Sequence, residues 1–155
     1  KIDKLLRLDL SVLSEVIATC CSIKASIVEQ DEREDDSRAV LNFGHTIGHA
    51  LESATHYRKF LHGEAVGIGM AQAAVISFQQ GFCDAATVDR IKKLIKVAGL
   101  PTEIPADLSL QSLIQSMQVD KKIAGGKIRF VMTAGLGKTR FHSLTPEQVA
   151  ATLGA

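Results

Sequence analysis

The sequence predicts a mainly α-helical domain with one small β-hairpin near its C-terminus. Apolar residues recur at helical spacing through most of the 155 residues, and only KIRFVMT has the composition and length of a convincing strand. The segment KTRFHSL follows it across the glycines at 135 and 137 and can pair with it. Because no repeat or low-complexity linker interrupts the sequence, we expect a single domain over residues 1–155.

Three helices are expected in the first half of the chain. An apolar stripe over residues 10–28 predicts the first. The second begins at Asp36 or Ser37, either of which is a good N-cap, and continues through Glu52. The third covers residues 64–79 and ends before a glycine.

Three more helices are expected in the second half. TVDRIKKLIKVAGLP is amphipathic and stops at its glycine and proline, and LSLQSLIQSMQ has the same period. TPEQVAATL carries a capping box formed by Thr145 and Gln148. AGLGKT ends like a phosphate-binding loop, but Met132 stands where that motif requires its first glycine, so we expect a turn.

Composition and charge exclude several classes of partner. A net charge of +1 with mixed signs gives no electrostatic reason to expect nucleic acid. No apolar run approaches the length of a transmembrane helix, so no membrane partner is expected. The adjacent Cys20 and Cys21 and the separate Cys83 favour buried thiols in a reducing cytoplasm over disulfides.

Three histidines stand out from the packing pattern. His45 and His49 lie four residues apart in LNFGHTIGHALE, and His62 follows at the start of a predicted helix. A pair at this spacing can share a metal ion, and with His62 it can form a three-histidine zinc site with one open position. The alternative is an ordinary solvated helix face. A helix N-terminus favours the neutral imidazole that a metal requires, whereas His56 and His142 read as surface residues.

Further polar residues occupy positions where apolar ones would pack better. At about 100° per residue, Arg38 and Asn42 fall on the same helix face as His45 and His49. The glycines at 44 and 48 each precede a histidine and leave room for a close backbone approach. Lys24 lies on the apolar face of the first helix, where it either reaches to solvent at the edge of the core or holds an anion in a cleft.

These segments together resemble the 3-dehydroquinate synthase family. The match consists of Lys24-Ala25, DERE, RAVLNFGHTIGHALE, LHGEAVGIGM and DKKIAGGKIRFVM in order and spacing, and it covers most of the chain. The resemblance is to the C-terminal, mainly helical domain of that family. The family's N-terminal NAD-binding domain has no counterpart in these residues.

The resemblance implies an enzyme that converts the sugar acid phosphate DAHP into 3-dehydroquinate and phosphate. This lyase reaction belongs to the shikimate pathway of aromatic amino acid biosynthesis. It implies catalytic NAD and a divalent metal, normally zinc, with cobalt as another possible metal. It also implies a cytoplasmic enzyme that forms a homodimer when full length. Within each chain, the N-terminal NAD-binding domain is the implied partner of these residues.

The resemblance also implies roles for individual residues. His45 and His62 match the family's metal-binding histidines, and the third ligand is a glutamate outside these residues. His49 matches a proton-transfer residue that also contacts substrate, which replaces the three-histidine reading. Glu34 matches a second proton-transfer residue. The matched substrate-binding positions are Lys24, Arg38, Asn42 and one of Lys121 and Lys122.

Three rival functions remain open. The chain can belong to another sugar phosphate cyclase, although Lys24 and Asn42 favour the shikimate enzyme. It can belong to a metal-dependent alcohol or glycerol dehydrogenase, whose substrate has no carboxylate to bind. It can also be a non-catalytic helical module. Without the glutamate ligand and the NAD site, residues 1–155 by themselves are expected to be inactive.

Overall fold

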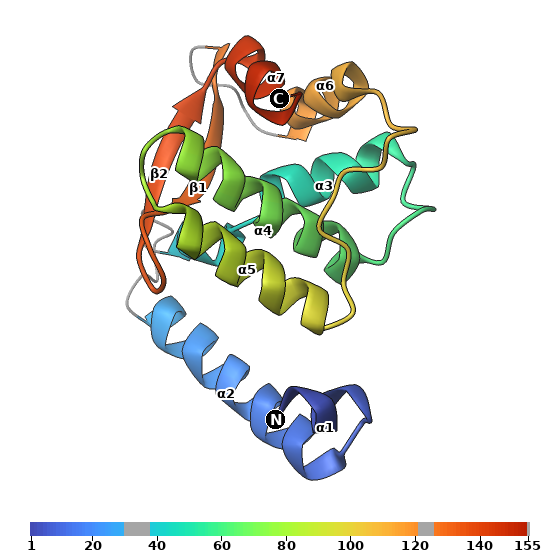
Figure 1. Ribbon diagram of the computed structural model, residues 1–155, viewed down its shortest axis with the longest axis vertical. Helices are drawn as coiled ribbons and strands as arrows, with labels where there is room; N and C mark the ends of the chain where they lie inside the picture. The colour runs from blue at the N-terminus through green and yellow to red at the C-terminus, as the bar shows by residue number, and fades with distance from the viewer. Residues whose placement is uncertain (30–37, 121–125, 155) are drawn as a thin grey trace. The chain divides into compact units, whose positions relative to one another are not determined.

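The computed structural model describes residues 1–29, 38–120 and 126–154 (Figure 1). These residues form two compact units, Lys1–Leu41 and Asn42–Ala155. Glu34, Lys121 and Lys122, three of the predicted site residues, lie outside the described residues, as does the predicted cap at Asp36 or Ser37. The single domain expected over residues 1–155 stays a prediction.

The first unit contains two helices, α1 (Ile2–Leu6) and α2 (Leu10–Glu29). The carboxylate of Asp9 accepts hydrogen bonds from the backbone N–H groups of Ser11 and Val12, which begins α2 where the sequence predicted it. Only Val12 of this helix is buried. The expectation of buried thiols is therefore wrong for Cys20 and Cys21, which are both exposed.

Helix α2 also corrects the expectation that no segment has the length of a membrane span. By length and composition its 20 residues suffice to cross a membrane, with a mean hydropathy of 1.5, and 6% of that segment is buried. The sequence analysis looked for an uninterrupted apolar run, whereas a few charged residues are tolerated in such a helix. Helices of this composition also occur as packed helices of soluble proteins.

The helix predicted from residue 36 or 37 to Glu52 is broken. A 3₁₀ helix, η1 (Arg38–Asn42), precedes α3 (His45–Ala54), and Gly44 between them has a φ of +83°. An L side chain rarely adopts this left-handed conformation, so glycine makes the break possible. The predicted polar stripe is wrong for this reason, because only His45 and His49 belong to α3.

Helix α4 (His62–Gln79) begins two residues before its predicted start and packs closely against α3 (Figure 1). A Cβ atom at Gly69 of α4 would overlap the carbonyl oxygen of Gly44. A Cβ atom at Gly48 would lie 3.2 Å from the backbone of Val66. The predicted close backbone approach at the glycines 44 and 48 is therefore confirmed.

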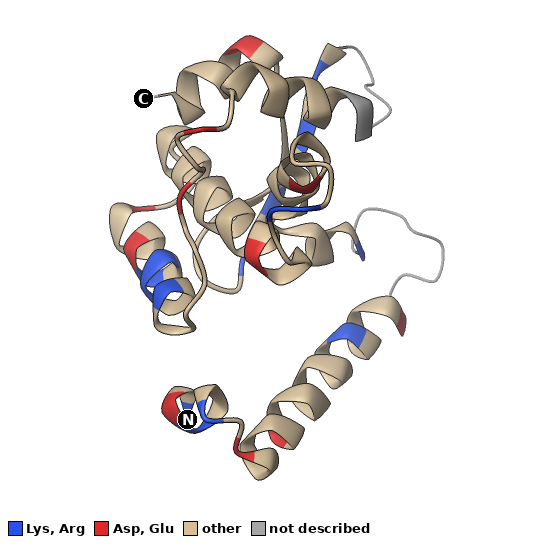
Figure 2. Ribbon diagram, turned by 90° about the vertical axis from the view of Figure 1, so that its right-hand side faces the viewer, with Lys and Arg blue, Asp and Glu red and all other residues tan. Residues whose placement is uncertain are grey.

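The remaining elements agree with the sequence. They are α5 (Ala85–Val97), α6 (Leu110–Asp120), β1 (Ile128–Thr133), β2 (Thr139–Leu144) and α7 (Pro146–Leu153). The strands pair antiparallel, from Ile128 opposite Leu144 to Thr133 opposite Thr139, and AGLGKT lies at the turn between them. The capping box of Thr145 and Gln148 is present. Helix α5 carries both acidic and basic residues, whereas the two strands carry only basic ones (Figure 2).

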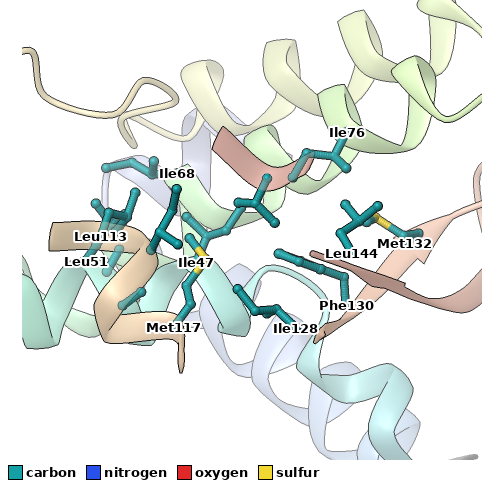
Figure 3. Packing of buried hydrophobic residues seen from close by; sticks show 14 residues of the cluster. Ile47, Leu51, Ile68, Ile76, Leu113, Met117, Ile128, Phe130, Met132 and Leu144 are labelled. Atoms are coloured by element: carbon teal, nitrogen blue, oxygen red, sulfur yellow. The ribbon is translucent and has the colours of Figure 1, made fainter. Parts of the chain in front are cut away.

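The core of the second unit joins α3, α4 and α6 to the hairpin (Figure 3). Fully buried apolar side chains come from every one of these elements, including Ile47, Ile68, Leu113 and Phe130. Thr46 donates a hydrogen bond to the carbonyl oxygen of Arg129, which ties α3 to β1. The predicted fold class, mainly α with a small C-terminal hairpin, is confirmed, and its core holds α3 and the start of α4 in place.

Candidate metal centre

Three histidine side chains meet where α3 faces the beginning of α4. Potential ligand nitrogens of His45, His49 and His62 all lie within 4.8 Å of one another. The ring centroids are 5.4 Å apart for His45 and His49, 5.5 Å for His45 and His62, and 5.9 Å for His49 and His62. The predicted proximity of His45 and His62 is confirmed, and the structure brings His49 to the same point.

Local geometry explains this convergence. His45 and His49 are one helical turn apart on α3, so their side chains project from the same face. His62 is the first residue of α4, where its ring projects from the helix end toward α3. The glycine contacts between the two helices bring the backbones close enough for these short side chains to meet.

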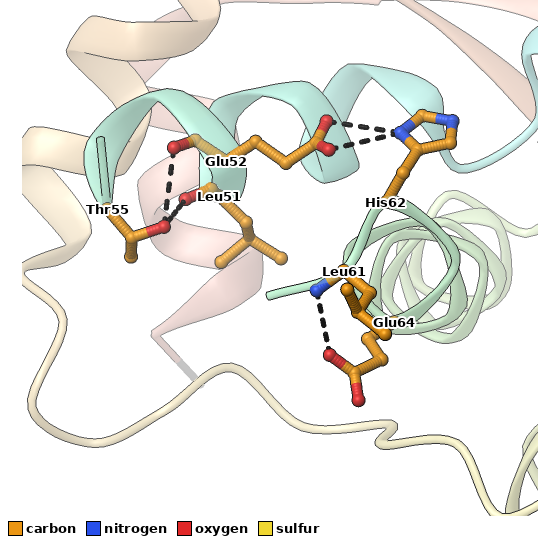
Figure 4. A network of polar contacts seen from close by, with 6 residues as sticks. All are labelled: Leu51, Glu52, Thr55, Leu61, His62 and Glu64. Atoms are coloured by element: carbon orange, nitrogen blue, oxygen red, sulfur yellow. Dashed lines mark hydrogen bonds and ion pairs between the residues drawn. The ribbon is translucent and has the colours of Figure 1, made fainter. Parts of the chain in front are cut away.

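The Nδ1 atoms of two of these rings face oxygen acceptors. The Nδ1 of His62 lies 3.1 Å and 3.2 Å from the two carboxylate oxygens of Glu52 (Figure 4). The side chain of Glu52 is 10% exposed, whereas that of His62 is 57% exposed. The Nδ1 of His45 lies 3.3 Å from the carbonyl oxygen of Phe43. Both contacts leave Nε2 as the ring nitrogen that can bind a further group.

The site favours a neutral imidazole at His45. Burial lowers the pKa of His45 below its ordinary value, and the neighbouring His49 and His62 lower that pKa further. The Phe43 carbonyl and the Glu52 carboxylate act in the opposite direction and do not outweigh burial. A metal ion binds neutral imidazole, so this cluster of three nitrogen donors fits a borderline-soft divalent cation such as zinc.

The other predicted site residues that the structure describes belong to neither α3 nor α4. Asn42 precedes the cluster in the second unit and is exposed. Lys24 and Arg38 belong to the first unit and are also exposed. Their predicted place in one cleft with the histidines depends on how the units are arranged in the protein, so it stays a prediction.

Sequence reasoning missed Glu52. In HTIGHALE it stands three residues after His49 and seven after His45, so helical spacing places all three on one face. An acidic residue on a histidine-bearing helix face was the available signal. Of the two histidines read as surface residues, His56 is exposed, but His142 is partly buried with its ring centroid 5.0 Å from that of Phe82.

Solved structures share this fold. Over 92% of this chain and 42% of the other, the chain superposes with a TM-score of 0.81 on a 2-deoxy-scyllo-inosose synthase that was crystallised with carbaglucose-6-phosphate, NAD⁺ and Co²⁺. The identity is 24%. A 2-epi-5-epi-valiolone synthase from Streptomyces hygroscopicus subsp. jinggangensis 5008, with NAD⁺ and Zn²⁺ bound, gives a TM-score of 0.73 at 23% identity over 93% of this chain and 39% of the other.

Sequence comparison gives closer relatives. The 3-dehydroquinate synthase of Desulforamulus reducens is 50% identical over 136 residues, which are 88% of this chain and 38% of that protein. That of Picosynechococcus sp. is 44% identical over 153 residues, 99% of this chain and 41% of that protein. The chain thus spans well under half the length of these relatives. Residues 1–123 match the family model described as 3-dehydroquinate synthase C-terminal, and the chain belongs to the 3-dehydroquinate synthase family.

Proposed function

We propose that this chain is the C-terminal part of a 3-dehydroquinate synthase that converts DAHP to 3-dehydroquinate and phosphate. The histidine cluster is the observation that carries the proposal, because its nitrogens lie within 4.8 Å of one another. Two relatives of this name are 50% and 44% identical over 88% and 99% of the chain. The reaction belongs to aromatic amino acid biosynthesis, and the enzyme is proposed to work in the cytoplasm.

His45 and His62 are proposed to hold the divalent metal, zinc or cobalt. When bound there, the metal would supply Lewis acidity toward a substrate oxygen, and NAD would supply hydride transfer. The two histidines offer their Nε2 atoms from different helices, so the metal also requires α3 and α4 to be packed. A glutamate from the rest of the protein is the proposed third ligand.

His49 is proposed to move a proton and contact substrate rather than bind the metal. Its ring lies 5.4 Å and 5.9 Å from those of the two proposed ligands, centroid to centroid. A neutral imidazole at this distance can accept a proton from a substrate hydroxyl beside the metal and return it. Glu34 is the second proposed proton-transfer residue.

Binding of the substrate's carboxylate and phosphate is assigned to side chains that donate hydrogen bonds. Lys24 and Arg38 supply positive charge, and Asn42 supplies an amide. One of Lys121 and Lys122 is proposed to add a further cation. Several charge-assisted contacts are needed, because the substrate carries two anionic groups.

The partners of the chain are proposed to be an NAD-binding N-terminal domain of the same protein and a second copy that completes a homodimer. The exposed apolar side chains of α2, among them Ile17 at 54% and Ile23 at 53% exposure, need cover from elsewhere in the protein. The relatives are long enough to supply such a domain, since the chain spans 38% of one and 41% of another. No nucleic acid or membrane partner is proposed.

Purified full-length protein with NAD, zinc and DAHP tests the proposal. Release of inorganic phosphate and formation of 3-dehydroquinate, identified by mass spectrometry, are the expected results. A hexose 6-phosphate and a simple alcohol serve as comparison substrates for the rival cyclase and dehydrogenase functions. Turnover of either without turnover of DAHP would refute the proposal, and turnover of none of them would favour the non-catalytic module.

A further inference from the structure

We infer that Glu52 is a positioning residue for the metal ligand His62. Its carboxylate holds the His62 imidazole in the tautomer with hydrogen on Nδ1, so that the Nε2 lone pair is the one presented to the metal. The inference deepens the proposed function, because it rests on the proposed ligand role of His62.

The contact is built from one buried and one exposed partner. Glu52 is 8% exposed at the core side of α3, and both of its carboxylate oxygens lie within 3.2 Å of His62 Nδ1. The His62 side chain is 57% exposed, so packing alone does little to fix its ring. Figure 4 shows the second ring nitrogen on the side away from the carboxylate.

Hydrogen-bond chemistry determines the tautomer. An ionised carboxylate can only accept, so the nitrogen that faces Glu52 carries the hydrogen. The other nitrogen then has its lone pair free for coordination. His45 has the same arrangement, with the Phe43 carbonyl oxygen facing its Nδ1. Both proposed ligands therefore present the same type of nitrogen.

Packing alone does not explain the carboxylate. Residues beside Glu52 on α3, such as Ala50 and Leu51, are fully buried and apolar, and an apolar side chain at position 52 would avoid the cost of desolvating a charge. A buried carboxylate that reaches ten residues along the chain to one exposed imidazole is instead the arrangement found behind metal-binding histidines.

The test compares Glu52→Ala and Glu52→Gln with Glu64→Gln in the full-length protein. Glu64 is the matched control, because its carboxylate caps the same helix end by accepting a hydrogen bond from the Leu61 N–H. The zinc dissociation constant is measured by competition with a chromophoric chelator. The tautomer of His62 is read from its nitrogen chemical shifts in metal-free protein labelled with ¹⁵N-histidine.

Glu52→Ala is expected to weaken zinc binding by about 10- to 100-fold and to reduce the population of the Nδ1–H tautomer of His62. Glu52→Gln has nearly the same shape as the parent and is expected to fold normally. Its zinc affinity and its Nδ1–H tautomer population should lie between those of the parent and Glu52→Ala, since its amide can both accept and donate a hydrogen bond. Glu64→Gln should keep zinc affinity and tautomer near those of the parent.

The inference is overturned if the Glu52 variants bind zinc as tightly as Glu64→Gln, if the His62 tautomer does not change, or if the parent protein binds no zinc. Its failure is distinguishable from that of the proposed function. Glu52-dependent zinc affinity without turnover of DAHP refutes only the reaction. Turnover of DAHP with Glu52-independent zinc affinity refutes only the inference.

Discussion

Gly69 of α4 packs directly against the carbonyl oxygen of Gly44, which a Cβ atom at position 69 would overlap. That oxygen accepts the first helical hydrogen bond of α3, from the N–H of Gly48 at 2.9 Å. The start of the histidine-bearing helix is therefore seated on the backbone of α4. Any side chain at position 69 has to push the two helices apart.

Gly69→Ala is accordingly expected to lower the free energy of unfolding by about 1–3 kcal/mol, the usual cost of overpacking. It should also weaken zinc binding, because His62 moves relative to His45. Gly67→Ala is the control, since a Cβ atom there meets its neighbours at 3.5 Å or more, an ordinary contact. Chemical denaturation should find that control unchanged or stabilised by up to about 1 kcal/mol. An equal loss of unfolding free energy in Gly69→Ala and Gly67→Ala would contradict this account.

Ligand and proton-transfer roles should separate in two histidine variants of the full-length enzyme. His45→Ala is expected to lose zinc together with activity, and excess zinc should restore part of the activity. His49→Ala should keep its zinc and lose about 10²- to 10⁴-fold in kcat, the usual contribution of a proton-transfer group. Bound zinc and steady-state rates are measured on the same preparations. Loss of zinc from His49→Ala alone would reverse the two assignments.

Arg38→Ala should harm the full-length enzyme far more than Arg140→Ala. A charged contact buried against substrate contributes about 2–5 kcal/mol, so kcat/KM is expected to fall at least tenfold. Arg140 lies 4.0 Å over the Phe82 ring on the exposed face of β2, where its loss should affect stability slightly and leave kcat/KM near that of the parent. Similar kcat/KM values for the two variants would remove Arg38 from the substrate site.

The pKa of His45 in metal-free protein should lie below 6.5, the ordinary value. Burial is the main cause, and the unfolded chain, which lacks it, binds the proton more readily. The contribution of His45 to stability is then complete above pH 6.5 and is lost as the pH falls through the folded-state pKa. Titration of the His45 ring protons by NMR measures this pKa, and a value above 6.5 would show that the Glu52 and Phe43 oxygens outweigh burial.

Residues 1–155 produced by themselves should show no turnover of DAHP. The proposed metal set within these residues has two histidines, fewer protein ligands than zinc sites normally use. The NAD site is assigned to the remainder of the longer protein. Phosphate release is measured with this segment and the full-length enzyme at equal concentrations, and turnover by the segment would make the N-terminal domain dispensable.

Much of the fold could be predicted because the deciding interactions are local. The glycine that ends α4, the Thr145–Gln148 box that begins α7 and the strand pattern of β1 each involve residues within one turn or one hairpin of each other. The histidine block is likewise compact in sequence. These features identified the family and the candidate metal residues before any tertiary contact was known.

Only the tertiary structure decided how the histidine block is presented. The helical period predicted one continuous helix through Gly44. The left-handed backbone of Gly44, against which Gly69 packs, separates η1 from α3, so Arg38 and Asn42 do not belong to the helix that carries the histidines. The pairing of Glu52 with His62 likewise requires the chain to reverse between α3 and α4. Sequence periodicity describes one helix at a time, whereas these contacts join two helices. The sequence alone thus identifies the candidate metal ligands of this protein, whereas the packing of α3 against α4 at their glycines determines how close those ligands lie.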